Sequence, residues 1–207
     1  MIPDPNETRN KILEAAIEVF NQKNYGDTSV NNITKVAGTS HGTFYIYFKN
    51  KRDALMELIK QVYSELYYST QKPWGTKSNT YESMEESIRG WFEVQSKHWK
   101  IIRTWKEVAH TDHEFAALWD HLSDKITLRI QQNIENSMKK NLCRDVNAHV
   151  AARAISGMIE HFGNLILVRQ QEYDLEEVIK TIADLWYHSI YVVPTTEKVN
   201  KQIEANP

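Results

Sequence analysis

The segment from Thr28 to Arg52 carries the residues whose chemistry is easiest to interpret. It contains four cations and no acid, although the whole chain of 207 residues has a net charge of −2. The cations are Lys35, Lys49, Lys51 and Arg52. Hydroxyl, amide and glycine residues lie between them, and such groups donate to phosphate oxygens or approach base edges. A basic segment on a mildly acidic protein predicts a polyanion as partner.

The same segment predicts two short helices separated by a glycine. Ser29 is placed to cap a helix over 29–37, and Ser40 to cap a second helix over 41–47. Gly38 supplies the permissive backbone of a tight turn. In such a helix-turn-helix the second helix meets base edges, while surrounding donors hold phosphates. The alternative is a solvated helical hairpin; the caps, the aromatic pair Phe44 and Phe48 and the charge segregation favour DNA binding.

Composition limits the other possibilities. The chain is 41% hydrophobic and 25% charged, which is ordinary for a globular protein in water. It has no long apolar run and no leader pattern, so we expect neither a transmembrane helix nor a signal peptide. The single Cys143 cannot form an intramolecular disulfide. We therefore expect a cytoplasmic protein with no membrane partner.

The rest of the chain predicts helices throughout. No proline lies between 74 and 193, and polar caps followed three residues later by an acid recur at Asn50, Asn79, Thr111 and Asp174. We predict an all-α fold of about nine helices, over 6–23, 29–37, 41–47, 51–71, 79–97, 100–109, 112–140, 146–170 and 175–193. The domains are a helix-turn-helix head over 1–52 and a larger body over 53–194. A loop near 71–78 and a polar tail over 195–207 complete the chain.

All six tryptophans lie in the body and none in the head. A single tryptophan on an apolar face is typical of a packed core. Several large aromatic residues on different helices can instead wall a small-molecule pocket, because such pockets are mostly apolar. Composition alone leaves core and pocket both open.

A resemblance to a known family rests on the motif Thr28-Ser-Val-x-x-Ile-x-x-x-Ala-Gly-Thr-Ser-x-Gly-Thr-Phe-Tyr-x-Tyr-Phe-x-x-Lys51 and the preceding helix over 12–20. These residues resemble the DNA-binding domain of TetR-type regulators. The resemblance implies phosphate contacts from Thr28, Tyr45, Tyr47 and Lys51. It implies contacts to bases or the adjoining backbone from Ser40, His41, Gly42 and Thr43. We add Lys35 and Thr39 to the predicted interface, and Thr39 stands where the family usually has Val.

The body carries a second resemblance. The stretches Ile88-Arg-Gly-Trp-Phe-Glu, Phe115-Ala-Ala-Leu-Trp-Asp and Ile182-Ala-Asp-Leu-Trp-Tyr-His-Ser-Ile-Tyr191 resemble the ethionamide-type repressors of the same family. This resemblance implies a ligand tunnel lined by Met84, Trp91, Trp119, Ile126, Ser156, Ile159, Glu160 and Trp186. Ser156 and Ile159 stand where those repressors carry amides, which implies a different polar anchor and a different ligand.

The last two predicted helices have apolar stripes broader than one core contact needs. In TetR-type proteins the two helices pair with their copies in a four-helix bundle. The predicted interface of this homodimer includes Ile155, Phe162, Ile166, Ile182 and Ile190.

Other chemistry has weak support. His110 and His113 lie near Asp112 and Glu114, but no third fixed ligand accompanies them, and helix capping explains the group equally well. We predict no metal, no cofactor and no enzymatic activity. The predicted function is a repressor that a lipophilic or aromatic small molecule releases from a double-stranded DNA operator. The alternative is a DNA-binding scaffold without an effector that acts through a protein partner.

Overall fold

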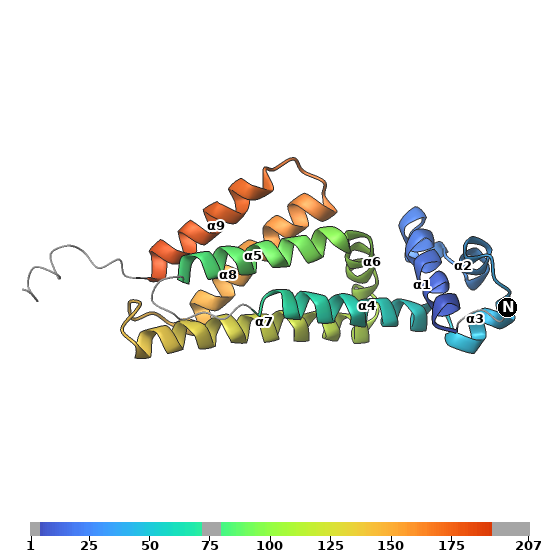
Figure 1. The fold of residues 1–207 in the computed structure, drawn as a ribbon, viewed down its shortest axis with the longest axis horizontal. Helices are drawn as coiled ribbons and strands as arrows, with labels where there is room; N and C mark the ends of the chain where they lie inside the picture. Colours follow the sequence, from blue (N-terminus) through green and yellow to red (C-terminus); the bar gives the residue numbers. More distant parts are fainter. Residues whose placement is uncertain (1–4, 72–79, 192–207) are drawn as a thin grey trace, which may run out of the picture.

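The computed structural model describes residues 5–71 and 80–191. Figure 1 shows a small head at one end and a longer helical body. The helices are α1 (Pro5–Gln22), α2 (Val30–Ala37), α3 (His41–Tyr47), α4 (Lys51–Ser69), α5 (Thr80–Lys97), α6 (Trp99–Ala109), α7 (His113–Lys139), α8 (Ala148–Gly163) and α9 (Leu175–Ile190). A 3-10 turn, η1 (Tyr25–Asp27), precedes α2, and a π-helical turn, η2 (Asn164–Val168), follows α8. The all-α prediction is confirmed.

The helix bounds follow the predictions closely, with one difference. The helix predicted over 146–170 is an α-helix only as far as Gly163, and it continues as the π-helical turn η2. A π-helical turn holds an extra residue, which hydrophobic periodicity does not reveal. The predicted tail over 195–207, and the predicted loop near 71–78 apart from Gln71, lie outside the described residues.

Local hydrogen bonds explain the two short helices of the head. Ser29 Oγ accepts from the amide of Asn32 at 3.2 Å, and Asn32 Oδ1 accepts from the amide of Ser29 at 3.0 Å. Ser40 Oγ accepts from the amide of Thr43 at 3.0 Å and so caps α3. Gly38 ends α2 with φ 64°, a left-handed conformation that side chains disfavour. These contacts fix the turn between α2 and α3.

The head has its own apolar centre, in which α1 packs on α2 and α2 packs on α3. Its fully buried or nearly buried side chains include Ile12, Phe20, Ile33, Phe44 and Phe48. The rings of Phe44 and Phe48 lie 5.7 Å apart. This packing holds α3 as a rigid element with its N-terminal turn at the surface.

The helix α4 belongs to both parts of the molecule. It begins beside the head and continues into the body alongside α7 (Figure 1). Its buried side chains run along its length, from Ala54 and Leu55 to Val62 and Leu66. The predicted domain boundary between residues 52 and 53 falls in its first turn and stays a prediction.

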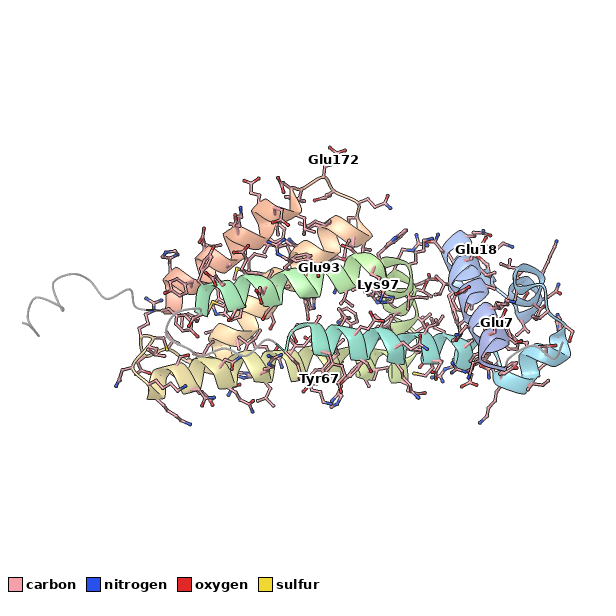
Figure 2. The ribbon with its side chains drawn as sticks, viewed as in Figure 1. Glu7, Glu18, Tyr67, Glu93, Lys97 and Glu172 are labelled. Carbon is pink, nitrogen blue, oxygen red and sulfur yellow. The ribbon has the colours of Figure 1, made fainter. Side chains whose placement is uncertain are left out.

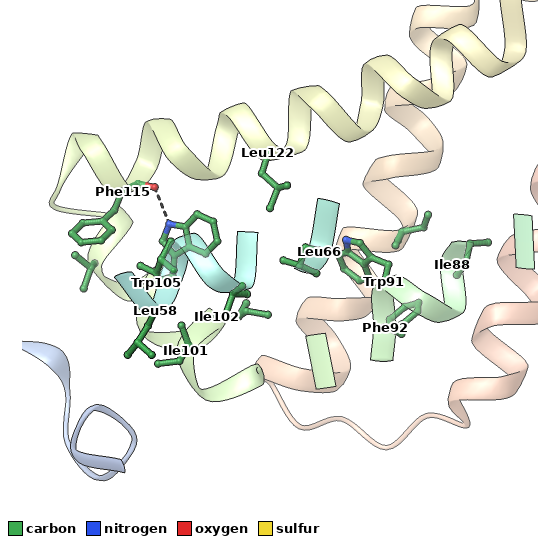
Figure 3. Close-up of a cluster of buried hydrophobic side chains, with 14 of the residues drawn as sticks. Leu58, Leu66, Ile88, Trp91, Phe92, Ile101, Ile102, Trp105, Phe115 and Leu122 are labelled. Atoms are coloured by element: carbon green, nitrogen blue, oxygen red, sulfur yellow. Dashed lines mark hydrogen bonds between the residues drawn. The ribbon is translucent and has the colours of Figure 1, made fainter. Parts of the chain in front are cut away.

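The body core contains two aromatic groups placed along α7 (Figure 3). In the first, Trp105 is fully buried and its Nε1 donates to the carbonyl oxygen of Phe115 at 2.9 Å. In the second, Trp91 lies near Leu66, and Leu122 of α7 lies between the groups. The α7 helix therefore passes both aromatic groups on its way from the head.

Candidate nucleic-acid interface and effector cavity

The first turn of α3 presents small polar groups. Ser40, His41 and Gly42 are exposed, and Thr43 is half-buried. The hydroxyl oxygens of Ser40 and Thr43 lie 2.9 Å apart. His41 Nε2 lies 3.1 Å from Asn31 Oδ1, so a surface contact also joins α3 to α2. This turn has the size and polarity to enter a major groove.

Further predicted residues surround this turn. Lys35 is exposed at the end of α2, Tyr45 is 56% exposed and Tyr47 is half-buried. The sequence interpretation missed Ile46, which is 77% exposed and can offer an apolar contact to a thymine methyl group. Figure 2 places the acidic Glu7 and Glu18 on α1.

Two predicted phosphate contacts lie inside the head. Thr28 is 5% exposed, and its hydroxyl donates to the carbonyl oxygen of Tyr25 at 2.8 Å. Lys51 Nζ donates to the carbonyl oxygens of Tyr25 at 2.7 Å, Thr28 at 2.8 Å and Gly26 at 3.3 Å. It also lies 4.4 Å from the centre of the Tyr25 ring, and burial lowers the pKa of Lys51. An ammonium has three donors, so Lys51 joins η1 to α4 with all of them.

Thr39 carries a polar group in an apolar position. Its amide donates to the carbonyl oxygen of Thr34 at 3.0 Å, which closes the turn after α2. Its hydroxyl oxygen is buried and has no hydrogen-bond partner among the described residues. A buried unpaired hydroxyl destabilises a fold. The departure from Val at this position therefore has a measurable physical consequence.

An ion-pair group joins the head to the body. Arg52 Nε lies 2.8 Å from Asp112 Oδ2, and Arg52 Nη2 lies 3.1 Å from Asp112 Oδ1 and 2.6 Å from Glu114 Oε2. The guanidinium also lies 4.8 Å from the centre of the Phe115 ring. The hydrogen bonds from Arg52 hold the pKa of Asp112 below its usual range. Arg52 therefore neutralises body acids and does not extend the basic surface of the head.

Two hydrogen bonds to α6 complete this contact. Glu107 Oε1 accepts from the amide of Tyr25 at 3.0 Å. Arg103 Nη2 donates to the carbonyl oxygen of Asn21 at 3.0 Å. We call these two bonds and the Arg52 pairs the junction. Through the junction, the position of the head depends on α6 and on the start of α7.

The body encloses a cavity between α4, α5, α7, α8 and α9. This first chamber has an empty volume of about 530 Å³, which includes the open space at its mouth. Six of the eight predicted lining residues form its wall: Trp91, Ile126, Ser156, Ile159, Glu160 and Trp186. The sequence interpretation missed the others: Thr70, Ser87, Ile88, Arg129, Ile130 and Asn133.

A second chamber of about 230 Å³ lies nearer the junction. Trp119 lines it, together with Leu66, Gln95, Leu122 and Ser123. Trp91, Ile126 and Glu160 line both chambers. Met84 is fully buried, but it is not among the described residues that line either chamber.

The two chambers follow one another along α7. Their walls include Trp119, Ile126 and Asn133 of this helix. Fourteen residues of helix separate the first from the last, which corresponds to about 21 Å at 1.5 Å per residue. The wall residues of α7 are spaced by three or four positions, and this spacing is visible in the sequence. The two chambers together therefore extend along about 21 Å of α7.

Most polar groups at the cavity already have partners. Thr127 Oγ1 and Ser156 Oγ lie 3.0 Å apart, and Ser123 donates to Glu160 Oε1 at 2.8 Å. Arg129 Nη1 lies 3.4 Å from Thr70 Oγ1, and burial lowers the pKa of this guanidinium. The apolar side chains of the wall are thus accompanied by partnered hydroxyl groups, by the cation of Arg129 and by the acid of Glu160.

Lys106 connects α6 to the second chamber. Its Nζ lies 4.9 Å from the centre of the Trp119 ring. Burial lowers the pKa of Lys106, and the charge of Glu160 opposes this shift. A side chain of the helix that also carries part of the junction therefore contacts Trp119, a wall residue of the second chamber.

The predicted dimer contacts need a correction. Ile155, Ile182 and Ile190 are 3%, 1% and 5% exposed in the single chain. Phe162 and Ile166 are half-buried. The three isoleucines are buried because α8 packs mainly on α7 and α9 mainly on α5. They are therefore unavailable to a partner subunit.

Other residues form the open face of these helices. Val150 and Leu185 are 60% and 56% exposed, Ala154 is exposed and Met158 is half-buried. On α8, Val150, Ala154 and Met158 recur every four positions, so they share one side of the helix. We call these four residues the open face of α8 and α9.

Two further findings concern only the described residues. No group of three or more His, Cys, Asp or Glu side chains is placed to hold a metal ion. In the same ranges, no helix combines the length and the apolarity needed to cross a bilayer.

A helix-turn-helix head joined by one continuous helix to a body with an internal cavity defines a one-component transcription regulator. Residues 12–58 match the model of the tetR family of bacterial regulatory proteins, and residues 84–192 match the C-terminal domain of the transcriptional regulator EthR. The chain belongs to the TetR family of transcriptional regulators. The matched proteins are regulators and not enzymes.

Similar proteins cover nearly the whole chain. It is 24% identical over 197 residues to the fatty acid metabolism regulator protein of Bacillus subtilis, across 87% of this chain and 94% of that one. It is 26% identical over 193 residues to the HTH-type transcriptional regulator EthR of Mycobacterium tuberculosis, across 91% of this chain and 89% of that one.

Solved structures share the fold. The fatty acid degradation regulator FadR of Bacillus halodurans superposes with a TM-score of 0.72 at 20% identity, across 86% of this chain and 94% of that one. A putative TetR-family transcriptional regulator of Syntrophomonas wolfei gives 0.70 at 23% identity, across 90% and 96%.

Proposed function

We propose that this chain is a dimeric repressor released from operator DNA by an elongated lipophilic molecule held in the body cavity. The observation that carries the proposal is the position of the second chamber. The ring of Trp119, on its wall, lies 5.0 Å from that of Trp105. Trp105 donates to the carbonyl of Phe115, whose ring faces Arg52 of the junction. Trp91, which a ligand in the first chamber meets, also lines the second chamber together with Trp119, so the ligand acts on a wall packed directly behind the junction.

The proposed DNA contacts divide into two kinds. Ser40, His41 and Gly42 meet base edges or the adjoining backbone, because they form the exposed first turn of α3. Lys35 and Tyr45 contact phosphates beside that turn. A dimer places its two α3 helices about 34–36 Å apart, one turn of DNA.

The open face supports the proposed homodimer. It places the apolar side chains of Val150 and Leu185 in water in the single chain. Pairing of α8 and α9 with their copies would remove these side chains from water, which favours association. The dimer would also provide the second α3 that a two-half-site operator requires.

The cavity wall supports the class of effector. Apolar side chains dominate the wall, as in pockets for lipophilic molecules. The guanidinium of Arg129 on the wall of the first chamber is suited to an acidic or ester group. Two similar proteins are named as regulators of fatty acid metabolism and of fatty acid degradation. We therefore take a fatty acyl compound as the effector class to test.

The proposed mechanism is a shift between two populations. Without ligand, the junction holds the heads at the spacing of the operator. A ligand that presses on the wall shared by the two chambers favours a state in which α6 and the start of α7 move, and α4 swings with them. Ligand and operator then weaken each other's binding by the same factor, because linkage is reciprocal.

Straight-chain saturated fatty acids provide the test, with operator binding followed by fluorescence anisotropy and ligand binding by calorimetry. We expect acids to bind the wild type and release it from DNA. Trp119→Ala should keep DNA binding, weaken the release, and cost less than the ~3–5 kcal/mol of a truncated core aromatic. Tyr68→Ala, on an exposed residue of α4 outside both chambers, should respond like the wild type.

Two outcomes would contradict the proposal. If no fatty acid binds the wild type or changes its affinity for DNA, the alternative of a DNA-binding scaffold without an effector is favoured. If Trp119→Ala loses stability and DNA binding together, Trp119 is a core residue and not a cavity wall.

A further inference from the structure

Three side chains separate the two chambers. Trp91, Ile126 and Glu160 are the residues common to both walls. The largest of them, Trp91, is 6% exposed, and its ring meets that of Phe92 edge to face at 5.1 Å. The indole of Trp91 therefore forms the main part of the partition in the cavity.

The indole of Trp91 lies directly against the backbone of α8. A Cβ placed on Gly163 would lie 2.6 Å from Trp91 Cη2 and 2.8 Å from Cζ3. These distances are far shorter than a van der Waals contact, so any other residue at this position would displace the ring. The ring also has no room to retreat towards α8. The helix changes to the π-helical turn η2 directly after Gly163, and such turns are frequent at functional sites.

We propose that Trp91, seated against Gly163, is a length stop that sets how long a ligand chain the protein accepts. The inference rests on the proposed function, in which the cavity holds an elongated lipophilic chain. A chain that enters the first chamber meets the edge or face of the indole at its end. Chains that fit in front of the indole bind, and additional length gains no further buried surface.

The two chambers have similar extents along α7. From Ile126 to Asn133, and from Trp119 to Ile126, the helix advances about 10 Å each. Removal of the partition should therefore nearly double the length of chain that the cavity can bury. Movement of the indole into the first chamber should shorten that length.

A series of straight-chain saturated fatty acids of increasing length tests the proposal by calorimetry. In the wild type, affinity should rise about fourfold for each added methylene until the chain reaches Trp91, and then stop rising. We call that chain length the break length. It is read from the protein alone, without DNA, so it does not depend on the release mechanism.

Two variants should move the break length in opposite directions. Trp91→Leu opens the partition, so affinity should continue to rise by about fourfold per methylene over several longer chains. Gly163→Ala adds a methyl group that pushes the indole into the first chamber, so the break should occur at shorter chains. The double variant is the matched control. The leucine does not reach the added methyl group, so this variant should have the break length of Trp91→Leu alone.

The results separate the inference from the proposed function. If no acid of any length binds the wild type, the proposed function fails, and the length stop fails with it. If acids bind but all variants share one break length, only the length stop is wrong. If Gly163→Ala shortens the break length by the same amount in the double variant as it does alone, the length stop is also wrong. Should Trp91→Leu not fold, Trp91→Phe carries the same test with a smaller shift to longer chains.

Discussion

Arg52 and Asp112 form a two-point ion pair in which each residue holds the start of a helix. Arg52 Nε and Nη2 lie 2.8 Å and 3.1 Å from the two carboxylate oxygens of Asp112. Arg52 lies in the first turn of α4, and Asp112 caps α7 by accepting from the amide of Glu114 at 3.0 Å. One carboxylate therefore ties the helix that leaves the head to the helix that lines both chambers.

Replacement of Arg52 by Gln should loosen the junction without unfolding the head. The side chain keeps much of its length, but it loses the charge that pairs with Asp112 and Glu114. We expect faster amide hydrogen exchange over 21–28 and 103–112, measured by mass spectrometry, and a weaker release from DNA by ligand. Lys97→Gln removes a different surface ion pair, with Glu65, and should leave exchange at the junction unchanged. Equal exchange in Arg52→Gln and the wild type would show that other contacts hold the junction.

The Asp112 pair predicts a dependence of stability on pH. Its folded pKa is lowered, so the pair contributes fully above the ordinary aspartate pKa of about 3.9, and its contribution is lost as the pH falls through the lower folded value. Asp112→Asn should keep the cap, since Asn also caps helices. The difference in unfolding free energy between wild type and variant should be constant from pH 8 to about 5 and shrink below about 4. A difference that grows in acid would contradict the assignment.

Thr39→Val should stabilise the protein. Valine has nearly the shape of threonine and removes a buried hydroxyl that has no hydrogen-bond partner among the described residues. We expect a gain of about 1 kcal/mol in unfolding free energy, measured by urea denaturation. Thr43→Val is a control on a hydroxyl that is partnered, by Ser40, and should give no gain. A loss of stability in Thr39→Val would mean that the hydroxyl is hydrogen-bonded in solution.

Lys51→Met should act on the fold of the head rather than on the count of phosphate contacts. The methionine keeps an apolar stem but leaves the carbonyls of Tyr25, Gly26 and Thr28 without the ammonium. We expect a loss of about 1–3 kcal/mol in stability and weaker binding to every DNA sequence. The dependence of affinity on salt should keep its slope. A slope lower by about one unit per subunit would instead place the ammonium of Lys51 on a phosphate.

These residues show which parts of the structure the sequence could predict. The caps at Ser29 and Ser40 depend on neighbours three residues away, so the short helices and their turn were readable from the chain. The position of Lys51 depends on carbonyls more than twenty residues away, which no local pattern reveals. From the sequence alone, a lysine at position 51 suits a phosphate contact as well as it suits a contact inside the head.

The open face of α8 and α9 shows a similar limit of prediction from the sequence. The stripes on α8 and α9 were correctly identified as apolar, but the pattern did not say which side each helix turns to its own subunit. Ile182 faces the core because α9 packs on α5, and Leu185, three residues further on, faces outward. In the cavity, the predicted residues were mainly those matched to a related repressor, so wall positions outside that match, such as Asn133, were missed.

Leu185→Asp should separate the proposed dimer. Leu185 is 56% exposed in the single chain, so the charge does not disturb the subunit core. In a dimer the charge would be desolvated, which costs several kcal/mol. Sedimentation should show monomers with a helical circular dichroism spectrum and little operator binding. Thr181→Asp provides the same test at a second exposed position of α9, one turn away. A wild type that is already monomeric at micromolar concentration would contradict the dimer itself.

The length of α4 gives small movements in the body a large effect at the DNA. The helix has 19 residues and is therefore about 28 Å long. A tilt of about 7° at its body end moves the other end by about 3.4 Å, which equals the rise of one base pair. A small tilt at the body end of α4 therefore becomes a larger displacement at its head end. In the proposed dimer, such a tilt would shift the two heads by a whole base step relative to each other.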